Sequence, residues 1–506
     1  MINNTLLFKS FSLLILFCKL MLVVGCQSTD RTKVKIDNGN WRPAVLAPKS
    51  LTTIFSSNRQ NLPASSQAST KAKESKVTKQ EYSLEQQANN NIDIQSPLPP
   101  LSNFLNNIPA TTTDEKLGIS SSLPVADKGV VRAGLLLPLT GKNGKLGQDM
   151  LQAAKLAFFG FADKKIELLI HDTQGNDEGA LLAGEMAIND GAQLILGPLL
   201  ASSVKILAPI AQQANIPVIA FSSDSDVAGG NIFTMGFPPE AQVDKIIKFA
   251  IQNGAKTFAT IAPENQYGET IVKQLLSVAE AEGASVSRIE FYDPKIKSFE
   301  PIVRKIADYD ARRTALLSER NLLIDQEDEL SKKTLKRLEA RQTLGDPPFD
   351  ALLLADGGAR LQEIAALLPF FDIDPAIVRI LGTGQWDFEG IGTEPALIGG
   401  HFAAPDPKFR ENFEDTYLEA FGHAPARLAT LAYDAVALAS VLAKGGKMPN
   451  RAVEAIIDPN GYSGRDGIFR FLPTGIVEHG LAVLRVKRDT SEVVVKSPQK
   501  FNTLVN

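Results

Sequence analysis

From residue 130 onward the chain alternates apolar runs of strand length with helical segments, and this alternation limits the possible folds more than any other feature. The first series contains the runs AGLLLPL, IELLIHD, AQLILGPL and PVIAFS, separated by segments of helical periodicity such as QDMLQAAKLAFFGF. Repeated strand, helix, strand units predict parallel strands joined by right-handed crossovers. We therefore expect a doubly wound parallel α/β sheet.

A second series of the same kind begins with KTFATIAP and continues through SVSRIEFYD, ALLLADGG and VRILGTG. Two series predict two α/β lobes. We assign the segments as follows: lobe 1, 129–238, completed by about 405–457; lobe 2, 239–404, completed by about 458–490; and a C-terminal tail, 491–506.

Residues 1–25 have the pattern of a secretion signal, because Lys9 precedes a long apolar run that ends at Val24. The following VVGC resembles a bacterial lipobox, in which the cysteine is acylated and becomes the first mature residue. Acyl chains anchor a protein by burying many CH₂ groups in the bilayer. We expect Cys26 to carry lipid; Lys19, inside the apolar run, leaves an ordinary signal or a short membrane anchor open as alternatives.

The segment from Cys26 to residue 128 is rich in Ser, Thr, Asn, Gln and Pro. Such a composition cannot bury enough apolar surface to offset its ordering entropy, so we expect a disordered tether. Gln27 stands where enteric lipoproteins retained at the inner membrane carry Asp. It therefore indicates an outer-membrane lipoprotein that faces the periplasm.

Charge and motif content exclude several function classes. With 53 Lys and Arg against 57 Asp and Glu, the chain has no broad basic surface for nucleic acid. The four histidines are scattered, and the sequence contains neither HExxH, nor GxSxG, nor a calcium loop. We expect no catalytic residues, no metal and no cofactor.

Several motifs together resemble a known family. VRAGLLLPLTGKNGKLGQDMLQAAKLA, QLILGPLLASS, IPVIAFSSDS, ENQYGETIV and LAYDAVALA follow the order and spacing of type I periplasmic binding proteins of the leucine-isoleucine-valine class. The resemblance covers roughly residues 130–490. It implies two α/β lobes joined by crossover strands, with any ligand held in the cleft between them.

The resemblance also marks an insertion in lobe 2, residues 308–346, between SFEPIVRKI and the strand of FDALLLADGG. Leu316, Leu323 and Leu330 recur at intervals of seven, with Leu317 and Ile324 beside them. This narrow stripe favours one long helix or a helical hairpin, packed on the lobe or projecting from it, with the leucines either self-packed or in a partner surface.

Two charge pairs in the insertion have the i,i+4 order that supports a helix: Asp328 with Lys332 and Glu329 with Lys333. The flanking TLGDPPFDALLLADGGARL, with LLPFFDIDP, LGTGQWD and GYSGRDGIFRFLPTGIVEHGLAVLRV, resembles the penicillin-binding protein activators, the lipoprotein family that includes LpoA. Members stimulate a bifunctional peptidoglycan synthase. In the enterobacterial protein a helical repeat domain precedes the binding-protein-like domain, whereas this chain has the tether there.

Cleft residues follow from topology, because ligands of open α/β sheets bind beyond the carboxyl ends of strands. The candidates are Thr140, Ser202, Ser203, Ser222, Ser223, Asp224, Tyr267, Asp356, Gly357, Gln385 and Trp386. In amino-acid-binding relatives, loops matching Ser202-Ser203 and FSSDS hold the ligand's carboxylate, and an acid of the second lobe holds its ammonium. The resemblance assigns that acid to Asp356 or Asp387.

Two candidates have competing interpretations. Asp224 stands where the relatives usually have a small residue, and its carboxylate would repel a ligand carboxylate, which argues against tight binding of leucine-type amino acids. Alternatively Asp224 caps a helix or turn and points away. Trp386 is either a stacking platform for a sugar or ring, or a tryptophan of the core or the lobe interface.

These features together predict a lipid-anchored, non-catalytic regulator that activates peptidoglycan synthesis by contacting a penicillin-binding protein. Its membrane contact would be the lipid on Cys26, and its candidate partner surface is the stripe of Leu316, Leu323 and Leu330. The alternative is the substrate-binding component of an ABC transporter for an amino acid or a related small molecule.

Overall fold

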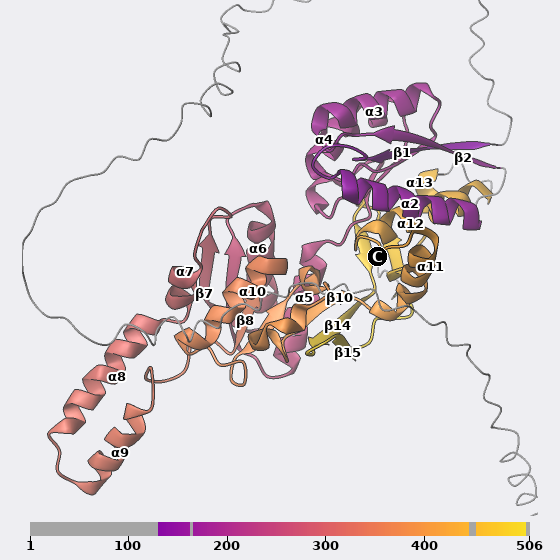
Figure 1. Cartoon of the computed structure of the whole chain (residues 1–506). Helices are drawn as coiled ribbons and strands as arrows, with labels where there is room; N and C mark the ends of the chain where they lie inside the picture. Colours follow the sequence, from indigo (N-terminus) through magenta and orange to yellow (C-terminus); the bar gives the residue numbers. More distant parts are fainter. Residues whose placement is uncertain (1–129, 162–164, 445–451, 502–506) are drawn as a thin grey trace, which may run out of the picture. The chain divides into compact units, whose positions relative to one another are not determined.

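A computed structural model describes residues 130–161, 165–444 and 452–501 (Figure 1). The expected signal peptide, Cys26 and the tether lie outside these residues. The described part contains two α/β units, which we call lobe 1 and lobe 2. No helix within these three ranges has the length and apolar character needed to span a bilayer.

Lobe 1 is built on a five-stranded parallel sheet of order β2-β1-β3-β4-β5. Its strands are β1 (Val131–Leu137), β2 (Ile166–Asp172), β3 (Leu194–Leu196), β4 (Val218–Ala220) and β5 (Ile232–Thr234). The crossover helices are α2 (Gly144–Phe161), α3 (Asp177–Asn189) and α4 (Ala201–Gln213). The almost wholly buried VRAGLLL of β1 is typical of a parallel strand covered on both faces.

Lobe 2 is built on a seven-stranded sheet of order β15-β14-β10-β9-β8-β6-β7. Its parallel strands are β6 (Thr257–Pro263), β7 (Ser285–Tyr292), β8 (Ala351–Leu354), β9 (Arg379–Gly382) and β10 (His401–Pro405). Its helices are α5 (Pro239–Gln252), α6 (Gln266–Ala281), α7 (Glu300–Ile306) and α10 (Gly358–Leu367). The predicted α/β alternation is confirmed in both lobes.

A glycine near the start of the helix that follows the first strand plays the same part in each lobe. A Cβ at Gly147 in α2 would lie 2.0 Å from the carbonyl oxygen of Pro138, and one at Gly268 in α6 would lie 1.9 Å from that of Pro263. Only glycine lets the helix approach the end of its preceding strand so closely. The loops at the carboxyl ends of β1 and β6 are therefore held tightly against their helices.

The chain returns to lobe 1 through α11 (Glu411–Phe421), α12 (Ala429–Lys444) and α13 (Ala452–Ile456), and α12 packs on α2. A small antiparallel sheet follows, made of β11 (Tyr462–Gly464), β12 (Gly467–Phe471) and β13 (Val477–His479). Phe469 and Phe471 of β12 join the core of lobe 1, where the Phe471 ring lies 5.6 Å from that of Phe233.

This packing differs from the sequence assignment, which gave the stretch from 458 to 490 to lobe 2. The aromatic residues of β12 need an apolar environment, and the core of lobe 1 provides it. Only β14 (Leu481–Val486) returns to the lobe 2 sheet, antiparallel to β10. The expected C-terminal tail also differs, because its first residues form the edge strand β15 (Ser491–Val495) beside β14.

The charged insertion is a helical hairpin made of α8 (Tyr309–Ile324) and α9 (Glu329–Glu339), which run side by side (Figure 1). Its base is fixed by Arg312, whose guanidinium group is buried. This group donates to the carbonyl oxygens of Ala307 (3.1 Å) and Gly345 (2.8 Å) and pairs with Asp372 (3.0 Å). One side chain thus joins both ends of the insertion to lobe 2.

The hairpin corrects the predicted leucine stripe. Leu316 is fully buried, Leu323 is half-buried and Leu330 is 75% exposed. Since α8 ends at Ile324 and the chain then reverses, Leu330 lies on the other helix and the seven-residue spacing no longer aligns it with the others. Leu316 is therefore unavailable to a partner.

The i,i+4 charge order supports a helix, and the segment is helical, but neither pair forms an ion pair among the described residues. Asp328 instead caps α9 by accepting hydrogen bonds from the backbone N–H groups of Leu330 (3.1 Å) and Ser331 (2.9 Å). A carboxylate turned toward the helix N-terminus cannot also reach along the helix to Lys332. The cap, rather than the pairs, defines where α9 begins.

Candidate functional site

A pocket of ≈ 210 Å³ lies where strand ends and helix starts of both lobes meet. It is lined by Ala201, Ser223, Asp224 and Ser225 of lobe 1 and by Pro239, Glu240, Gln266, Tyr267 and Thr270 of lobe 2. Three of the eleven predicted cleft residues, Ser223, Asp224 and Tyr267, thus come together. The pocket is smaller than the roughly 300–1,000 Å³ typical of sites for drug-sized ligands, so any occupant must be small.

Asp224 forms much of the lobe 1 wall. Its Oδ1 accepts a hydrogen bond from the N–H of Asp226 (3.0 Å), which caps a short 3₁₀ helix. Its Oδ2 accepts from the side chain of Gln266 in lobe 2 (2.9 Å) and lies 3.8 Å from Lys205 Nζ. Both interpretations of Asp224 are thus partly realised, since the residue is a cap and still lines the pocket.

Tyr267 and Glu240 form the lobe 2 wall. The hydroxyl of Tyr267 hydrogen-bonds to Thr383 Oγ1 at 2.8 Å, and burial raises the pKa of this phenol above its ordinary value. Glu240 lies in the first turn of α5, and its Oε2 is buried with no hydrogen-bond partner within the described part of the chain. No pattern in the sequence singled out Glu240, because a glutamate in a first helical turn is ordinary.

The predicted hydroxyls of lobe 1 are engaged elsewhere. Thr140 donates to Asp172 (2.6 Å), while Ser202 and Ser203 both donate to one oxygen of Asp177 (2.7 and 3.1 Å). Asp177 lies in the first turn of α3, close to the start of α4. These hydroxyls therefore bind protein carboxylates and do not line the pocket.

The remaining candidates belong to the protein framework. Ser222 accepts a hydrogen bond from the N–H of Asp224, and Gln385 is exposed. The buried carboxylate of Asp356 accepts hydrogen bonds from the Tyr292 hydroxyl and the Gly357 N–H, and it pairs with Arg360. Trp386 is fully buried, and its indole donates to the carbonyl of Leu354 at 3.3 Å. The stacking-platform interpretation of Trp386 is wrong, because the ring fills the core of lobe 2.

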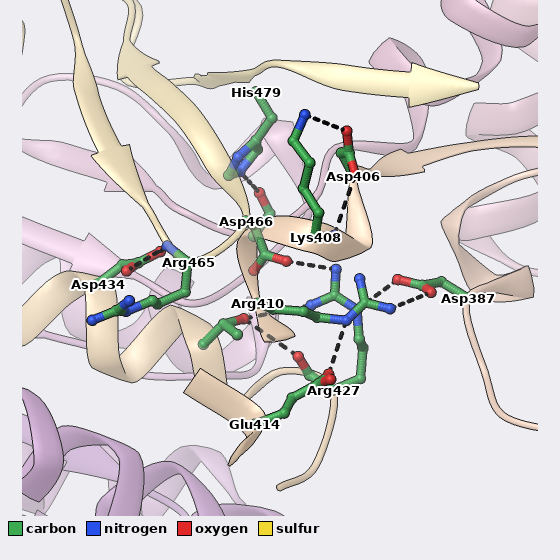
Figure 2. Close-up of polar contacts among 12 residues, drawn as sticks. Asp387, Asp406, Lys408, Arg410, Glu414, Arg427, Asp434, Arg465, Asp466 and His479 are labelled. Atoms are coloured by element: carbon green, nitrogen blue, oxygen red, sulfur yellow. Dashed lines mark hydrogen bonds and ion pairs between the residues drawn. The ribbon is translucent and has the colours of Figure 1, made fainter. Parts of the chain in front are cut away.

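Asp387, the other predicted acid, lies in a buried charge cluster rather than in the pocket (Figure 2). Arg410 donates to its Oδ1 at 2.7 Å and Arg427 to its Oδ2 at 2.8 Å. Arg427 also pairs with Asp466 at 2.8 Å, and Arg410 with Glu414 at 2.9 Å. This charge cluster connects the end of β9 in lobe 2 to the segments that complete lobe 1.

Burial and neighbouring charges shift the pKa values of several groups in and around this cluster. Although burial disfavours a charged guanidinium, Asp466 and Asp387 raise the pKa of Arg427 above its ordinary value. Burial and the neighbouring charge of Asp466 raise the pKa of Asp434 well above that of a free carboxyl. Burial lowers the pKa of His479, whose Nε2 lies 2.9 Å from the carbonyl oxygen of Gly236. Within the cluster, the carboxylate of Asp387 is thus held by two guanidinium groups, those of Arg410 and Arg427.

A second pocket of ≈ 300 Å³ lies at the opposite strand ends of lobe 2, lined by Phe249, Arg379 and His401 among others. The His401 ring lies 5.1 Å from the Phe249 ring. Burial lowers the pKa of His401 most, and the positive charges of Arg485 and Arg379 lower it further. In the described residues no three His, Cys, Asp or Glu side chains gather as metal ligands would.

A family model described as periplasmic binding protein matches residues 130–491. The leucine-binding protein LivK of Thermotoga maritima superposes with a TM-score of 0.51, over 72% of this chain and 97% of its own, at 20% identity. At this identity the likeness concerns the fold, which is that of type I periplasmic binding proteins.

Curated relatives match over shorter stretches. An uncharacterized protein of Rickettsia prowazekii is 24% identical over 179 residues, which are 35% of this chain and 47% of that protein. The penicillin-binding protein activator LpoA of Vibrio cholerae is 26% identical over 143 residues, 28% of this chain and 24% of that protein. The matches thus span less than half the length of either relative.

Proposed function

Because the chain belongs to the periplasmic binding protein family, we propose that it is a non-catalytic regulator that activates peptidoglycan synthesis by contacting a penicillin-binding protein. The similarity to the penicillin-binding protein activator LpoA supports this regulatory role. We further propose that lipid on Cys26 anchors the protein to the outer membrane, facing the periplasm. The tether would then let the two lobes reach a synthase away from the anchor.

The observation that carries the proposal is the surface of the α8–α9 hairpin. Leu322, Ile324 and Leu330 are 67%, 65% and 75% exposed and lie at the end of the hairpin remote from Arg312. Isolated exposed apolar residues are common on proteins, but several at one hairpin end form a candidate protein contact. We call these three residues the hairpin tip.

Charges flank this tip. Asp325, Glu327 and Asp328 occupy the turn between the helices, and α9 presents the exposed basic side chains of Lys332, Lys333, Lys336 and Arg337. None of these four cations forms an ion pair with another described residue. An apolar centre with charged surroundings is the usual composition of a protein interface, in which the apolar part supplies affinity and the charges orient the partner.

Site-specific photo-crosslinking tests the proposal. A photoreactive residue in place of Leu330, in the full chain in cells, is expected to capture a peptidoglycan synthase, identified by mass spectrometry. The control places it at Leu182 of α3, which is 51% exposed on lobe 1 and should not capture the synthase. Failure to capture a synthase at Leu330, or equal capture at both positions, would contradict the proposal.

The second candidate is the substrate-binding component of an ABC transporter. The pocket between lobes favours this function, because binding proteins hold their ligands there and Tyr267 still contributes to it. Capture of a membrane permease instead of a synthase would support the transporter role. Association with a permease should also depend on a small molecule, whereas contact through the hairpin tip should not.

A further inference from the structure

The second pocket, of ≈ 300 Å³, lies away from the pocket between the lobes, at the amino-terminal ends of β9 and β10. Arg379 begins β9 and His401 begins β10, and both residues line the pocket. The other lining residues are uncharged: Phe249, Asn253, Pro375, Ile380, Gly399 and Gly400. The volume is at the lower end of the roughly 300–1,000 Å³ of small-molecule sites. The pocket is thus large enough for a small ligand and has no acidic wall.

Strand register explains why basic side chains gather here. Side chains two residues apart along a strand point to the same face of a sheet. Arg379, His401 and Arg485 of β14 therefore share a face with three residues of the core that packs against α5: Leu381, Ala403 and Val483. His401 also lies directly opposite Arg485 in the pairing of β10 with β14. Since like charges at opposed positions destabilise a sheet, a protonated His401 requires an anion nearby.

The acid closest to these groups neutralises them only in part. Glu492 of β15 lies 2.7 Å from Arg485 and 2.9 Å from Lys487, so one carboxylate is shared between two cations. Burial lowers the pKa of His401, and the charges of Arg485 and Arg379 lower it further. The His401 ring therefore lies in a positive field despite the presence of Glu492.

The donors of Arg379 and His401 are only partly used. Arg379 Nη2 donates to the carbonyl oxygen of Asn253 at 2.6 Å, and no acid of the described residues forms an ion pair with this guanidinium group. Asp350, just before β8, instead accepts two backbone N–H groups near the start of β6 (2.9 and 3.0 Å). Neither ring nitrogen of His401 is hydrogen-bonded within the described chain, and both side chains are only half-buried. Donors of both residues therefore remain accessible to a ligand.

These unused donors match a carboxylate. The planar N–H groups of a guanidinium fit the two oxygens of a carboxylate, and an imidazolium adds a second charge-assisted hydrogen bond. Phe249, Pro375 and Ile380 supply apolar surface for a short hydrocarbon body. Inorganic phosphate would gain nothing from this surface. The lining therefore favours an organic acid over free phosphate.

We propose that this pocket binds a small organic carboxylate, with its oxygens on Arg379 and His401 and its hydrocarbon part against Phe249. The Phe249 ring lies 5.1 Å from the His401 ring, so one ligand of a few carbon atoms can contact both. The site lies at the strand ends opposite to the pocket between the lobes. It goes beyond the regulatory role proposed above and does not depend on the hairpin tip.

NMR spectroscopy of the purified full chain locates the binding. The chain has four histidines, so its imidazole signals are few, and His401→Gln identifies the signal of His401. The probes are butanoate and benzoate, with butanamide as the uncharged analogue and inorganic phosphate as the other anion. We expect at least one carboxylate to shift the His401 signal saturably, and more weakly at high salt, whereas butanamide should not. Phosphate should bind at least tenfold more weakly than that carboxylate.

Matched variants identify the groups responsible. Arg379→Gln removes the charge and should weaken carboxylate binding at least tenfold, measured by calorimetry. His401→Gln should weaken it several-fold. Because the His401 ring makes no hydrogen bond within the described chain, this variant should keep the melting temperature of the wild type. Arg341→Gln and His423→Gln change exposed side chains elsewhere and should leave binding unchanged.

Three results would overturn the inference. The first is an absence of carboxylate binding to the wild type, or binding that is unchanged in both pocket variants. The second is binding that shifts the signals of other histidines and leaves that of His401 in place. The third is phosphate or butanamide binding more tightly than either carboxylate.

Discussion

Arg427 Nε lies 2.8 Å from Asp387 Oδ2, and this contact joins the end of β9 in lobe 2 to the start of α12 in lobe 1. The Arg427 guanidinium also lies over the ring of Phe237, 5.1 Å from its centre. A cation placed between a carboxylate and an aromatic ring in a buried position is held in one arrangement. The contact therefore restricts how the two lobes can move relative to each other.

The first prediction removes the acid from this contact. Asp387→Asn leaves Arg410 and Arg427 with one neutral partner in a buried site, and breaking a buried pair in this way typically costs about 3–5 kcal/mol. We expect a loss of this size in the free energy of unfolding, measured by urea denaturation. Glu414→Gln is the control: Glu414 pairs with the same Arg410, but its side chain is 45% exposed, so the loss should stay below about 1 kcal/mol. Equal losses would show that burial of the Asp387 pair is unimportant.

The sequence could predict the parallel strands of both lobes because the evidence for each strand is local. Each strand is a short apolar run and each helix has its own periodicity, so neither depends on distant residues. The charge cluster could not be predicted in this way. Asp387, Arg410, Arg427 and Asp466 come from separate segments, and only folding brings them together.

The buried position of Trp386 is related to a nearby glycine in the sequence, Gly382. A Cβ at Gly382, four residues earlier, would lie 2.1 Å from the indole ring, so the ring packs directly on this glycine. A glycine spaced to accept a tryptophan ring favours a core position over a ligand platform. The pocket residue Glu240 had no comparable signal, since only the buried and unpartnered state of its oxygen distinguishes it.

The second prediction concerns pH. Burial and the charge of Asp466 raise the pKa of Asp434 in the folded state, so the folded state favours the protonated acid. Its stabilising contribution is complete below the unfolded pKa of about 3.9 and is lost as the pH rises through the folded pKa. Relative to Asp434→Asn, the wild type should therefore lose unfolding free energy as the pH rises from about 4 through the raised folded-state pKa. A difference that is constant over this range, or that increases in favour of the wild type, would contradict the prediction.

The third prediction concerns the anchor. If Cys26 is acylated, metabolic labelling with a fatty-acid analogue should mark the wild type, and Cys26→Ser should abolish the label and leave a soluble or uncleaved form. Acyl chains are needed for stable attachment because each buried CH₂ contributes only about 0.8 kcal/mol. A wild type without label would refute lipidation. A labelled protein that fractionates with the inner membrane would refute only the outer-membrane location indicated by Gln27.

The last prediction is that the hairpin is dispensable for folding and required for activation. Arg312 donates to the carbonyl oxygens of Ala307 and Gly345 through the same guanidinium group, so the two ends of the insertion lie close enough for a short Gly-Ser link to replace residues 310–345. The entropy cost of closing a loop depends only weakly on loop length, so the shorter link should change stability little. The buried leucines of the hairpin, Leu316 and Leu338, belong to none of the hydrophobic core clusters of the two lobes.

We therefore expect the helical circular dichroism signal of the shortened protein to fall only by the contribution of α8 and α9. The free energy of unfolding should decrease by at most a few kcal/mol. The shortened protein should no longer stimulate a peptidoglycan synthase. A triple variant, Leu322→Ser, Ile324→Ser and Leu330→Ser, keeps the hairpin and removes only its exposed apolar side chains, so it should fold normally and lose the same activity. Leu182→Ser with Met186→Ser removes exposed apolar residues from α3 instead and should retain activity. Unfolding of the shortened protein would refute dispensability, and full activity of the triple variant would refute the partner role of the hairpin tip.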